Sequence, residues 1–267
     1  MGKMEQIGDA SGFWGKIPKS IISFGFDNEP ETEKKEETLE RKEAVRVVVE
    51  QMLSLVEKKY GTGANDGENP KFYHNLVHTQ NAREAAQKIA ELAAKHGKIF
   101  MSEVELAEIA AAGHDLEQDL GSGENERTSA RMTREEMGKT GVFSNSDIEK
   151  VEKMELATTV SFEGGVMKQS ATEEYLTQVI ADADLSALGQ PSEQYWATAQ
   201  ALLKEIKNTD TPSVEDQLVW AKGQIAFLSN HEFYTDEAKE LFPHKEENIA
   251  FAKEQVAALE AEISQVK

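Results

Sequence analysis

The amino-acid sequence predicts an all-α fold, a helical bundle of roughly nine helices. Apolar residues recur at spacings of three and four along most of the chain, which is the period of a helix that buries one face. No stretch shows the sustained alternation of apolar and polar residues, bounded by hairpin turns, that is typical of β-strands. The predicted helices lie at about 38–60, 72–95, 102–115, 125–139, 146–160, 172–184, 191–207, 213–228 and 246–263.

Start and stop signals define the first three helices. The glycine-rich segment 61–67 ends the first helix, and Gly97 stops the second. Ser102, followed three residues later by Glu105, forms a capping-box pattern that begins the third. Because the third helix is rich in small residues, we expect it to pack closely inside the bundle.

The later helices are delimited in the same way. Glycines within 121–123 and 164–165 break the chain, and two helices lie between these breaks. Thr172, with two glutamates after it, opens the sixth helix, and Pro191 followed by serine begins the seventh. Ser213 caps the eighth helix. A loop follows that helix, and the last helix begins after this loop.

The composition predicts one main domain with an extension. Hydrophobic residues make up 39% of the 267 residues, which is enough to fill one core. We expect residues 38–267 to form this domain and residues 1–37 to form an N-terminal extension. The charged part of the extension, 29–36, is typical of a flexible, solvated linker. The apolar part, 12–24, is expected to pack on the domain or to be disordered, and the alternative is a membrane-surface or partner-binding peptide.

The charge of the chain argues against several partners. With 49 acidic and 29 basic residues, the formal net charge is −20, which disfavours binding to duplex nucleic acid or to an anionic membrane surface. No apolar run approaches the ~20 residues that span a bilayer. Glu5 and Asp9 interrupt the basic-then-apolar plan of a secretory signal, so we expect a cytoplasmic protein. The sequence indicates no particular oligomeric state.

Histidines and carboxylates in three separated segments indicate a metal site. The chain has no cysteine, so any metal ligand must come from these residue types. His74 and His78 are four apart, so both rings can share one helix face if the helix has begun by His74. His114 and Asp115 end the small-residue helix, where a metal would satisfy both buried groups. The competing interpretation of this pair is a solvent-exposed helix end.

The third segment carries two aspartates in an otherwise apolar helix. Asp182 and Asp184 are two residues apart, which separates their directions on a helix by about 200°. The two carboxylates should therefore not share one role. One of them can bind metal, while the other should cap a helix, form a pair or orient a ligand.

The order of these motifs, first His, then His-Asp, then Asp, resembles the HD superfamily of metal-dependent phosphohydrolases. The segments 73–78, 114–115, 125–130 and 182–189 are similar to the predicted phosphohydrolases of that superfamily. The resemblance covers about residues 40–260. It implies an all-α HD-type domain and a metal-dependent phosphohydrolase activity, as phosphomonoesterase or phosphodiesterase.

The resemblance also implies roles for individual residues. Asp184 is preferred over Asp182 because 183–186 matches the stretch in which cyclic-nucleotide phosphodiesterases place their last ligand. His74 matches the histidine that protonates the leaving oxygen, and Glu126 is expected to orient a water or a ligand. The implied metal ligands are His78, His114, Asp115 and Asp184, and the implied catalytic residues are His74, Asp115 and Glu126.

The implied donor set defines the class of metal. Two imidazoles and two carboxylates suit Mn²⁺, Fe²⁺, Co²⁺, Ni²⁺ or Zn²⁺ better than Ca²⁺, and Mg²⁺ is also possible. Relatives that hold two metals often carry a further histidine shortly after an Ala-Thr pair, but no histidine follows Ala157 and Thr158 here. We therefore expect one tightly bound ion.

Basic side chains near the motifs are candidates for holding substrate phosphates. Arg127 and Arg131 are four apart, so they can form one stripe on a helix. Arginine forks match phosphate oxygens in a bidentate way. A solvated, salt-bridged face is the competing interpretation. The four candidates are Lys71, Arg83, Arg127 and Arg131.

These patterns lead to one expected function and two alternatives. The expected protein hydrolyses a phosphate ester of a small molecule, a nucleotide or cyclic nucleotide, with a metal-activated water. The first alternative is a nucleotide-sensing or scaffold HD module that binds metal but has negligible turnover. The second is an oxidative HD enzyme with two irons, which a single-metal site disfavours.

Overall fold

A computed structural model describes residues 31–63, 65–163 and 166–266. The chain divides into two compact units, Met1–Glu37 and Thr38–Lys267. The contacts discussed below lie in the second unit. The apolar segment 12–24, for which the sequence leaves several roles open, lies outside the described residues.

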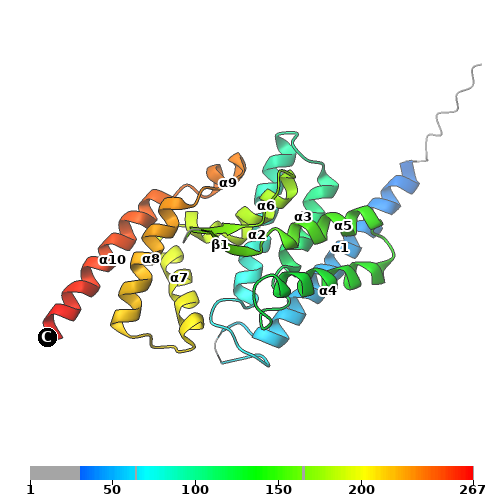
Figure 1. Ribbon diagram of the computed structural model, residues 1–267. Helices are drawn as coiled ribbons and strands as arrows, with labels where there is room; N and C mark the ends of the chain where they lie inside the picture. The colour runs from blue at the N-terminus through cyan, green and yellow to red at the C-terminus, as the bar shows by residue number, and fades with distance from the viewer. Residues whose placement is uncertain (1–30, 64, 164–165, 267) are drawn as a thin grey trace, which may run out of the picture. The chain divides into compact units, whose positions relative to one another are not determined.

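The described part of the chain is mainly helical, as the sequence predicts (Figure 1). None of its helices combines the length and apolar character needed to cross a membrane. A 3₁₀ helix, η1 (Ser186–Gly189), and a two-stranded antiparallel hairpin, β1 (Val160–Glu163) and β2 (Val166–Gln169), complete the fold. The ten α-helices are α1 (Glu31–Tyr60), α2 (Leu76–Lys95), α3 (Met101–Gly113), α4 (Glu124–Thr140), α5 (Asn145–Leu156), α6 (Tyr175–Asp184), α7 (Ser192–Lys207), α8 (Val214–Asn230), α9 (Asp236–Leu241) and α10 (Lys245–Val266).

Three helix starts differ from the sequence prediction, and one of them is that of α6, which begins at Tyr175 rather than at Thr172. Helix α2 begins at Leu76 rather than near residue 72, because the Asn75 side chain caps it. His74 therefore lies before the helix. Helix α3 begins ahead of the predicted capping residue Ser102, and the side chain of Glu103 accepts a hydrogen bond from the Phe100 backbone N–H instead.

Three further differences concern short or charged segments. Helix α1 begins at Glu31, so the charged residues from there to 37, predicted as a linker, are helical. The β1–β2 hairpin was not predicted, because strands of four residues are too short to show alternation. The six-residue helix α9 was missed for the same reason.

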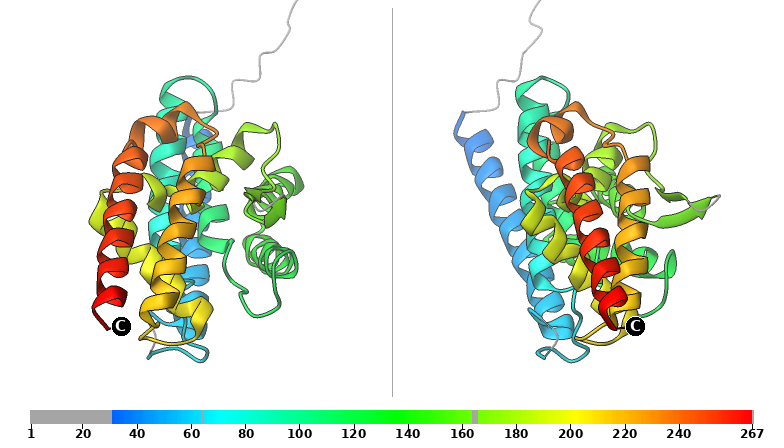
Figure 2. Two further views of the ribbon diagram at one scale, coloured as in Figure 1. Left: turned by 60° about the vertical axis from the view of Figure 1, so that its left-hand side comes forward. Right: turned by 90° about the vertical axis from the view of Figure 1, so that its left-hand side faces the viewer.

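The helices of the second unit pack in two neighbouring groups. Helices α2, α3, α5 and α6 contact one another, and α4 packs against α3 and α5. Helices α7, α8 and α10 form the other group, in which α8 and α10 run side by side in opposite directions (Figures 1 and 2). The core is continuous, and in α3 the run from Leu106 to Gly113 is buried except for Glu108. Because α3 is buried on nearly all sides, the polar residues at its C-terminal end are held in a fixed position.

Candidate metal centre

The first metal-site histidine is fixed by the start of α2. The Asn75 side chain accepts hydrogen bonds from the backbone N–H groups of Val77 and His78, and its amide donates to the carbonyls of Lys71 and Phe72. This cap pins the chain on both sides of the helix start. His78 lies in the first turn of α2 and its side chain is buried.

The end of α3 places His114 and Asp115 in the interior. Both residues are buried, which excludes the alternative of a solvent-exposed helix end. Gly113 before them has no room for a side chain, since a Cβ there would lie 2.2 Å from Thr133 Oγ1 and 2.3 Å from Glu155 Oε1. The close approach of α4 and α5 to this glycine therefore sets the position of the histidine that follows.

The two aspartates of α6 point to different partners, as their spacing predicts. Asp182 is fully buried and accepts hydrogen bonds from the backbone N–H groups of Tyr234 and Thr235, both at 2.8 Å, and from the Thr235 hydroxyl at 2.7 Å. Asp184 faces the histidines instead, and its Oδ2 accepts a hydrogen bond from Gln169 Nε2 at 3.0 Å. Asp182 holds the chain that enters α9, and Asp184 belongs to the site.

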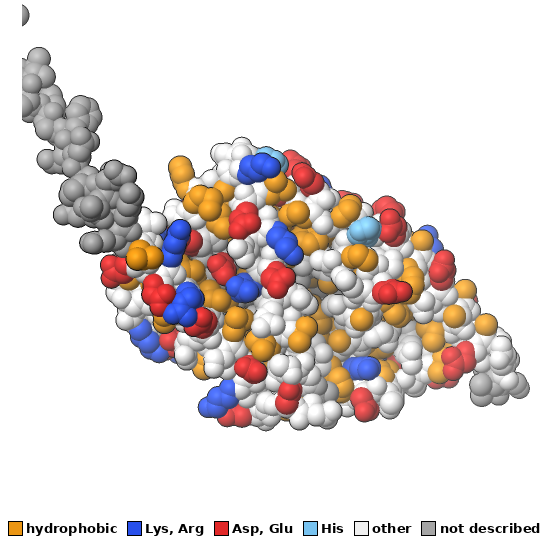
Figure 3. Space-filling model, turned by 180° about the vertical axis from the view of Figure 1, so that it is seen from behind, with side chains coloured by type: hydrophobic (Ala, Val, Ile, Leu, Met, Phe, Trp, Pro, Cys, Tyr) orange, Lys and Arg blue, Asp and Glu red, His pale blue; other side chains and the backbone are white. Residues whose placement is uncertain are grey.

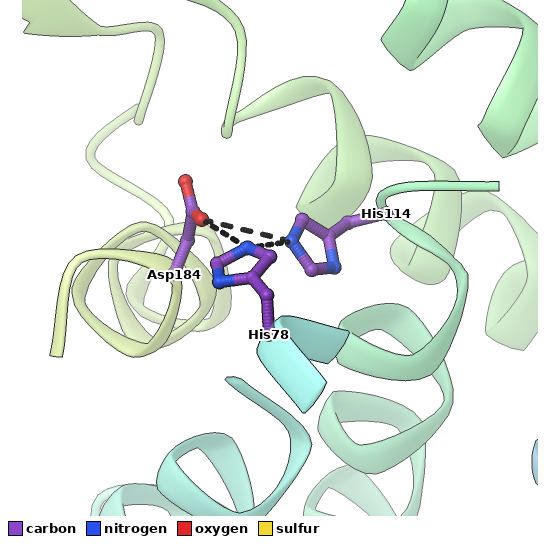
Figure 4. A group of neighbouring side chains, drawn as sticks. All are labelled: His78, His114 and Asp184. Carbon is purple, nitrogen blue, oxygen red and sulfur yellow. Dashed lines mark hydrogen bonds and ion pairs between the residues drawn. The ribbon is translucent and has the colours of Figure 1, made fainter. Parts of the chain in front are cut away.

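Three side chains, from α2, from the residue that follows α3 and from α6, converge on one point (Figure 4). His78 Nε2 lies 3.4 Å from His114 Nε2 and 3.3 Å from Asp184 Oδ1. His114 Nε2 lies 3.6 Å from the same carboxylate oxygen. The ligand atoms of this group all lie within 4.8 Å of one another, so the group could hold a metal ion.

Asp115 is the fourth member of the cluster. Its Oδ2 lies 3.1 Å from His78 Nε2 and 3.2 Å from His114 Nε2, yet it is buried without a hydrogen bond of normal geometry. Its other oxygen, Oδ1, accepts a hydrogen bond from Gln118 Nε2 at 2.7 Å. A buried carboxylate oxygen this close to two imidazole nitrogens is suited to share a cation with them.

The separations within the cluster suit ligands of one metal ion. With metal–ligand bonds of about 2.1 Å, neighbouring ligands lie about 3.0 Å apart around an octahedral ion and about 3.4 Å apart around a tetrahedral one. The separations in the cluster run from 3.1 to 3.6 Å, which spans both geometries. His114 Nδ1 lies 2.8 Å from the Ala111 carbonyl oxygen, to which it donates, so Nε2 is left to face the cluster.

The charges of the cluster shift its pKa values strongly. Burial lowers the pKa of His78, but hydrogen bonds and charge interactions with Asp115 and Asp184 outweigh burial and raise it to about 9. His114 is affected in the same way, and its pKa is raised. Burial raises the pKa of Asp184, but the two histidines lower it to about 2, and the pKa of Asp115 is also lowered. The two carboxylates thus favour positive charge on the imidazoles, and a metal cation would compete with protons for the same nitrogens.

The predicted proton donor, His74, lies beside the cluster. Its ring centroid is 5.8 Å from that of His78. Its Nδ1 contacts Glu205 Oε1 at 2.5 Å, and Glu205 Oε2 also accepts the backbone N–H groups of Tyr73 and His74. Glu205 comes from α7, more than 120 residues later, and the sequence carries no signal for this pairing.

The four candidate phosphate-binding cations each pair with a carboxylate in the described structure. On the face that Figure 3 shows, Lys and Arg side chains lie interspersed with Asp and Glu side chains. This arrangement matches the competing interpretation of a salt-bridged surface. The pairs are Lys71 with Asp119 at 2.9 Å, Arg83 with Glu108 at 2.6 Å, Arg127 with Glu124 at 2.7 Å and Arg131 with Glu135 at 3.1 Å.

Glu126 has a local structural contact. Its Oε2 accepts the backbone N–H of Gly123, at the N-terminus of its own helix α4. Gly123 adopts φ +84°, a conformation that side chains rarely allow. This contact fixes the start of α4, and the role in orienting a water or a ligand stays a prediction.

No protein-family model matches this chain, and no curated protein matches it. Membership of the HD superfamily therefore stays a prediction from the sequence motifs.

Proposed function

We propose that the protein is a metal-dependent phosphohydrolase of the HD type, which cleaves the phosphate ester of a small molecule. The observation that carries the proposal is the convergence of two imidazoles and two carboxylates, of which the first three are buried and the last is partly buried: His78, His114, Asp115 and Asp184. This donor set favours Mn²⁺, Fe²⁺, Co²⁺, Ni²⁺ or Zn²⁺. When bound, such an ion supplies Lewis acidity, which polarises a phosphoryl oxygen and acidifies water.

The His74–Glu205 pair supports hydrolysis over metal storage. Glu205 accepts at Nδ1 and fixes the ring, so Nε2 of His74 is the atom left to give a proton to the leaving oxygen. Burial raises the pKa of Glu205, but the His74 hydrogen bond outweighs it and the pKa is lowered, which keeps this carboxylate ionised. A histidine held by a carboxylate beside a metal group is suited to acid catalysis.

A metal analysis and a substrate panel test the proposal together. The purified protein is measured for bound metal and assayed against phosphomonoesters and phosphodiesters, including nucleotides and cyclic nucleotides, with several divalent ions. We expect metal-dependent release of phosphate or a phosphomonoester, lost in His114→Ala and Asp115→Ala. If both variants keep the metal content and the activity of the wild type, the proposal is wrong.

Calorimetry with a nucleotide panel tests the sensor alternative. A sensor would show tight, metal-dependent binding without any product. That result would replace hydrolysis by ligand sensing, while the metal centre itself would remain.

A further inference from the structure

A cavity of about 420 Å³ opens beside the metal centre. Asp184 and Tyr73 border it, and the Tyr73 ring centroid lies 4.4 Å from that of His78. A volume of this size is typical of small-molecule sites. The cavity therefore lies where the part of a substrate that is not at the metal would extend.

The cavity wall is mainly apolar. It is formed by the segment after α6 and by helices α7 and α8, whose long side chains there are Leu185, Leu188, Leu202, Ile206, Trp220 and Phe227. Among the described residues that line it there is no Lys or Arg, and Asp184 is the one charged group. A second or third phosphate would find no cation in this wall, so the metal centre is the place for a single phosphoryl group.

Several polar groups of the wall have hydrogen-bond partners within the protein. The Thr198 hydroxyl donates to the Gln194 carbonyl at 3.0 Å, and the Asn230 amide donates to the Ala226 carbonyl at 2.7 Å. The Tyr195 hydroxyl donates to Gln224 Oε1 at 2.9 Å. A nucleobase carries several donors and acceptors at its edge, and burying them without partners is costly.

One buried donor of the wall lacks a partner. Trp220 Nε1 is buried without a hydrogen bond, which marks it out among the described residues that line the cavity. Buried indole N–H groups usually find an acceptor. A single oxygen on an otherwise apolar ligand would satisfy it.

We propose that the substrate is a monophosphate ester of an apolar alcohol, with the phosphate at the metal centre and the hydrocarbon part in this cavity. The inference rests on the proposed function. In the reaction the oxygen of water bonds to phosphorus and the bond from phosphorus to the alcohol oxygen breaks. His74 protonates that oxygen, so inorganic phosphate and the apolar alcohol leave.

A series of n-alkyl phosphates tests the inference. Calorimetry on the full-length, Mn²⁺-loaded protein compares ethyl, butyl and hexyl phosphate with adenosine monophosphate. Each buried methylene should tighten binding by up to about fourfold, and hexyl phosphate should bind more tightly than the nucleotide. Affinity that does not change with chain length, or a nucleotide that binds more tightly than hexyl phosphate, would overturn the inference.

Two glycines provide a matched pair of variants. Gly223 lines the cavity on α8, and a Cβ there would meet nothing within 4 Å, so Gly223→Phe can attach its side chain at this wall without a clash at Cβ. Gly138 on α4 has the same free space but does not line the cavity. Gly223→Phe should weaken hexyl phosphate binding by about tenfold or more and leave Mn²⁺ binding unchanged, whereas Gly138→Phe should change neither.

A polar substitution gives a second test, and turnover separates the two proposals. Leu202→Gln should reduce the gain in affinity per methylene, and if neither it nor Gly223→Phe weakens hexyl phosphate binding, the inference is wrong. Binding that depends on chain length, without turnover of any phosphate ester, would retain the cavity assignment and reject phosphohydrolysis. Turnover of a phosphate ester with no dependence of binding on chain length would retain phosphohydrolysis and reject the cavity assignment.

Discussion

Asp182 and Asp184 lie two residues apart on α6, yet their surroundings shift their pKa values in opposite directions. Burial raises the pKa of Asp182 to about 6, and its hydrogen bonds from Thr235 and Tyr234 offset this only in part. Burial acts on Asp184 in the same sense, but His114 and His78 lower its pKa to about 2. Partners, rather than depth, thus decide which carboxylate is a structural anchor and which carries negative charge available to a cation.

The largest expected difference between the two aspartates is in metal affinity. Asp184→Asn removes a charged oxygen from the cluster, so we expect Mn²⁺ affinity to fall by more than about 100-fold, beyond what loss of an outer contact costs. Asp182→Asn should keep the metal, because its partners lie on the segment that enters α9. Equilibrium dialysis of both variants measures this. Equal losses of Mn²⁺ affinity in the two variants would contradict the assignment of Asp184, rather than Asp182, as the metal ligand.

A second expectation separates metal binding from proton transfer. Glu205→Gln weakens the hold on His74 without touching the metal ligands, so the turnover rate should fall by roughly 100-fold while metal content stays at the wild-type level. The pH profile of the rate should also shift, which loss of folding alone would not cause. An unchanged rate and profile would show that His74 needs no carboxylate.

The third expectation concerns stability and pH. The pKa of Asp182 is about 6 in the folded protein and near 3.8 when unfolded, so the unfolded chain releases this proton first. The contribution of Asp182 to the free energy of unfolding should be fully present below about pH 4. It should fall by about 3 kcal/mol as the pH rises through about 6. Denaturant unfolding at several pH values measures the difference between wild type and Asp182→Asn. A difference that is constant with pH would contradict the raised pKa.

The smallest effect is expected at the surface arginines. Arg127 and Arg131 pair with exposed glutamates on their own helix, and such pairs contribute little to stability. Replacing both by alanine should leave the KM for a phosphate ester within about twofold. A rise in KM of tenfold or more would restore them as phosphate-binding residues.

The sequence predicted those features that depend on local spacing. The 3.6-residue period revealed the nine longer helices, and the two-residue spacing of Asp182 and Asp184 predicted that they would diverge. The start of α2 was predicted near residue 72, but the helix begins at Leu76, because the Asn75 side chain caps it there.

Features that depend on long-range packing could not be predicted. Glu205 reaches His74 only because α7 packs beside the chain that enters α2, and no local pattern encodes that contact. The cavity likewise arises from α7 and α8 together with the segment after α6, so its apolar character is spread over distant residues. The pairing of Lys71 with Asp119 and of Arg83 with Glu108 is a tertiary property as well.

Anomalous diffraction from crystals grown with Mn²⁺ tests the central claim most directly. We predict one strong peak at about 2.2 Å from His78 Nε2, His114 Nε2, Asp115 Oδ2 and Asp184 Oδ1, with Asp182 remaining bound to Thr235. Crystals with no peak at this cluster, while Mn²⁺ is bound at another carboxylate group, would contradict the account.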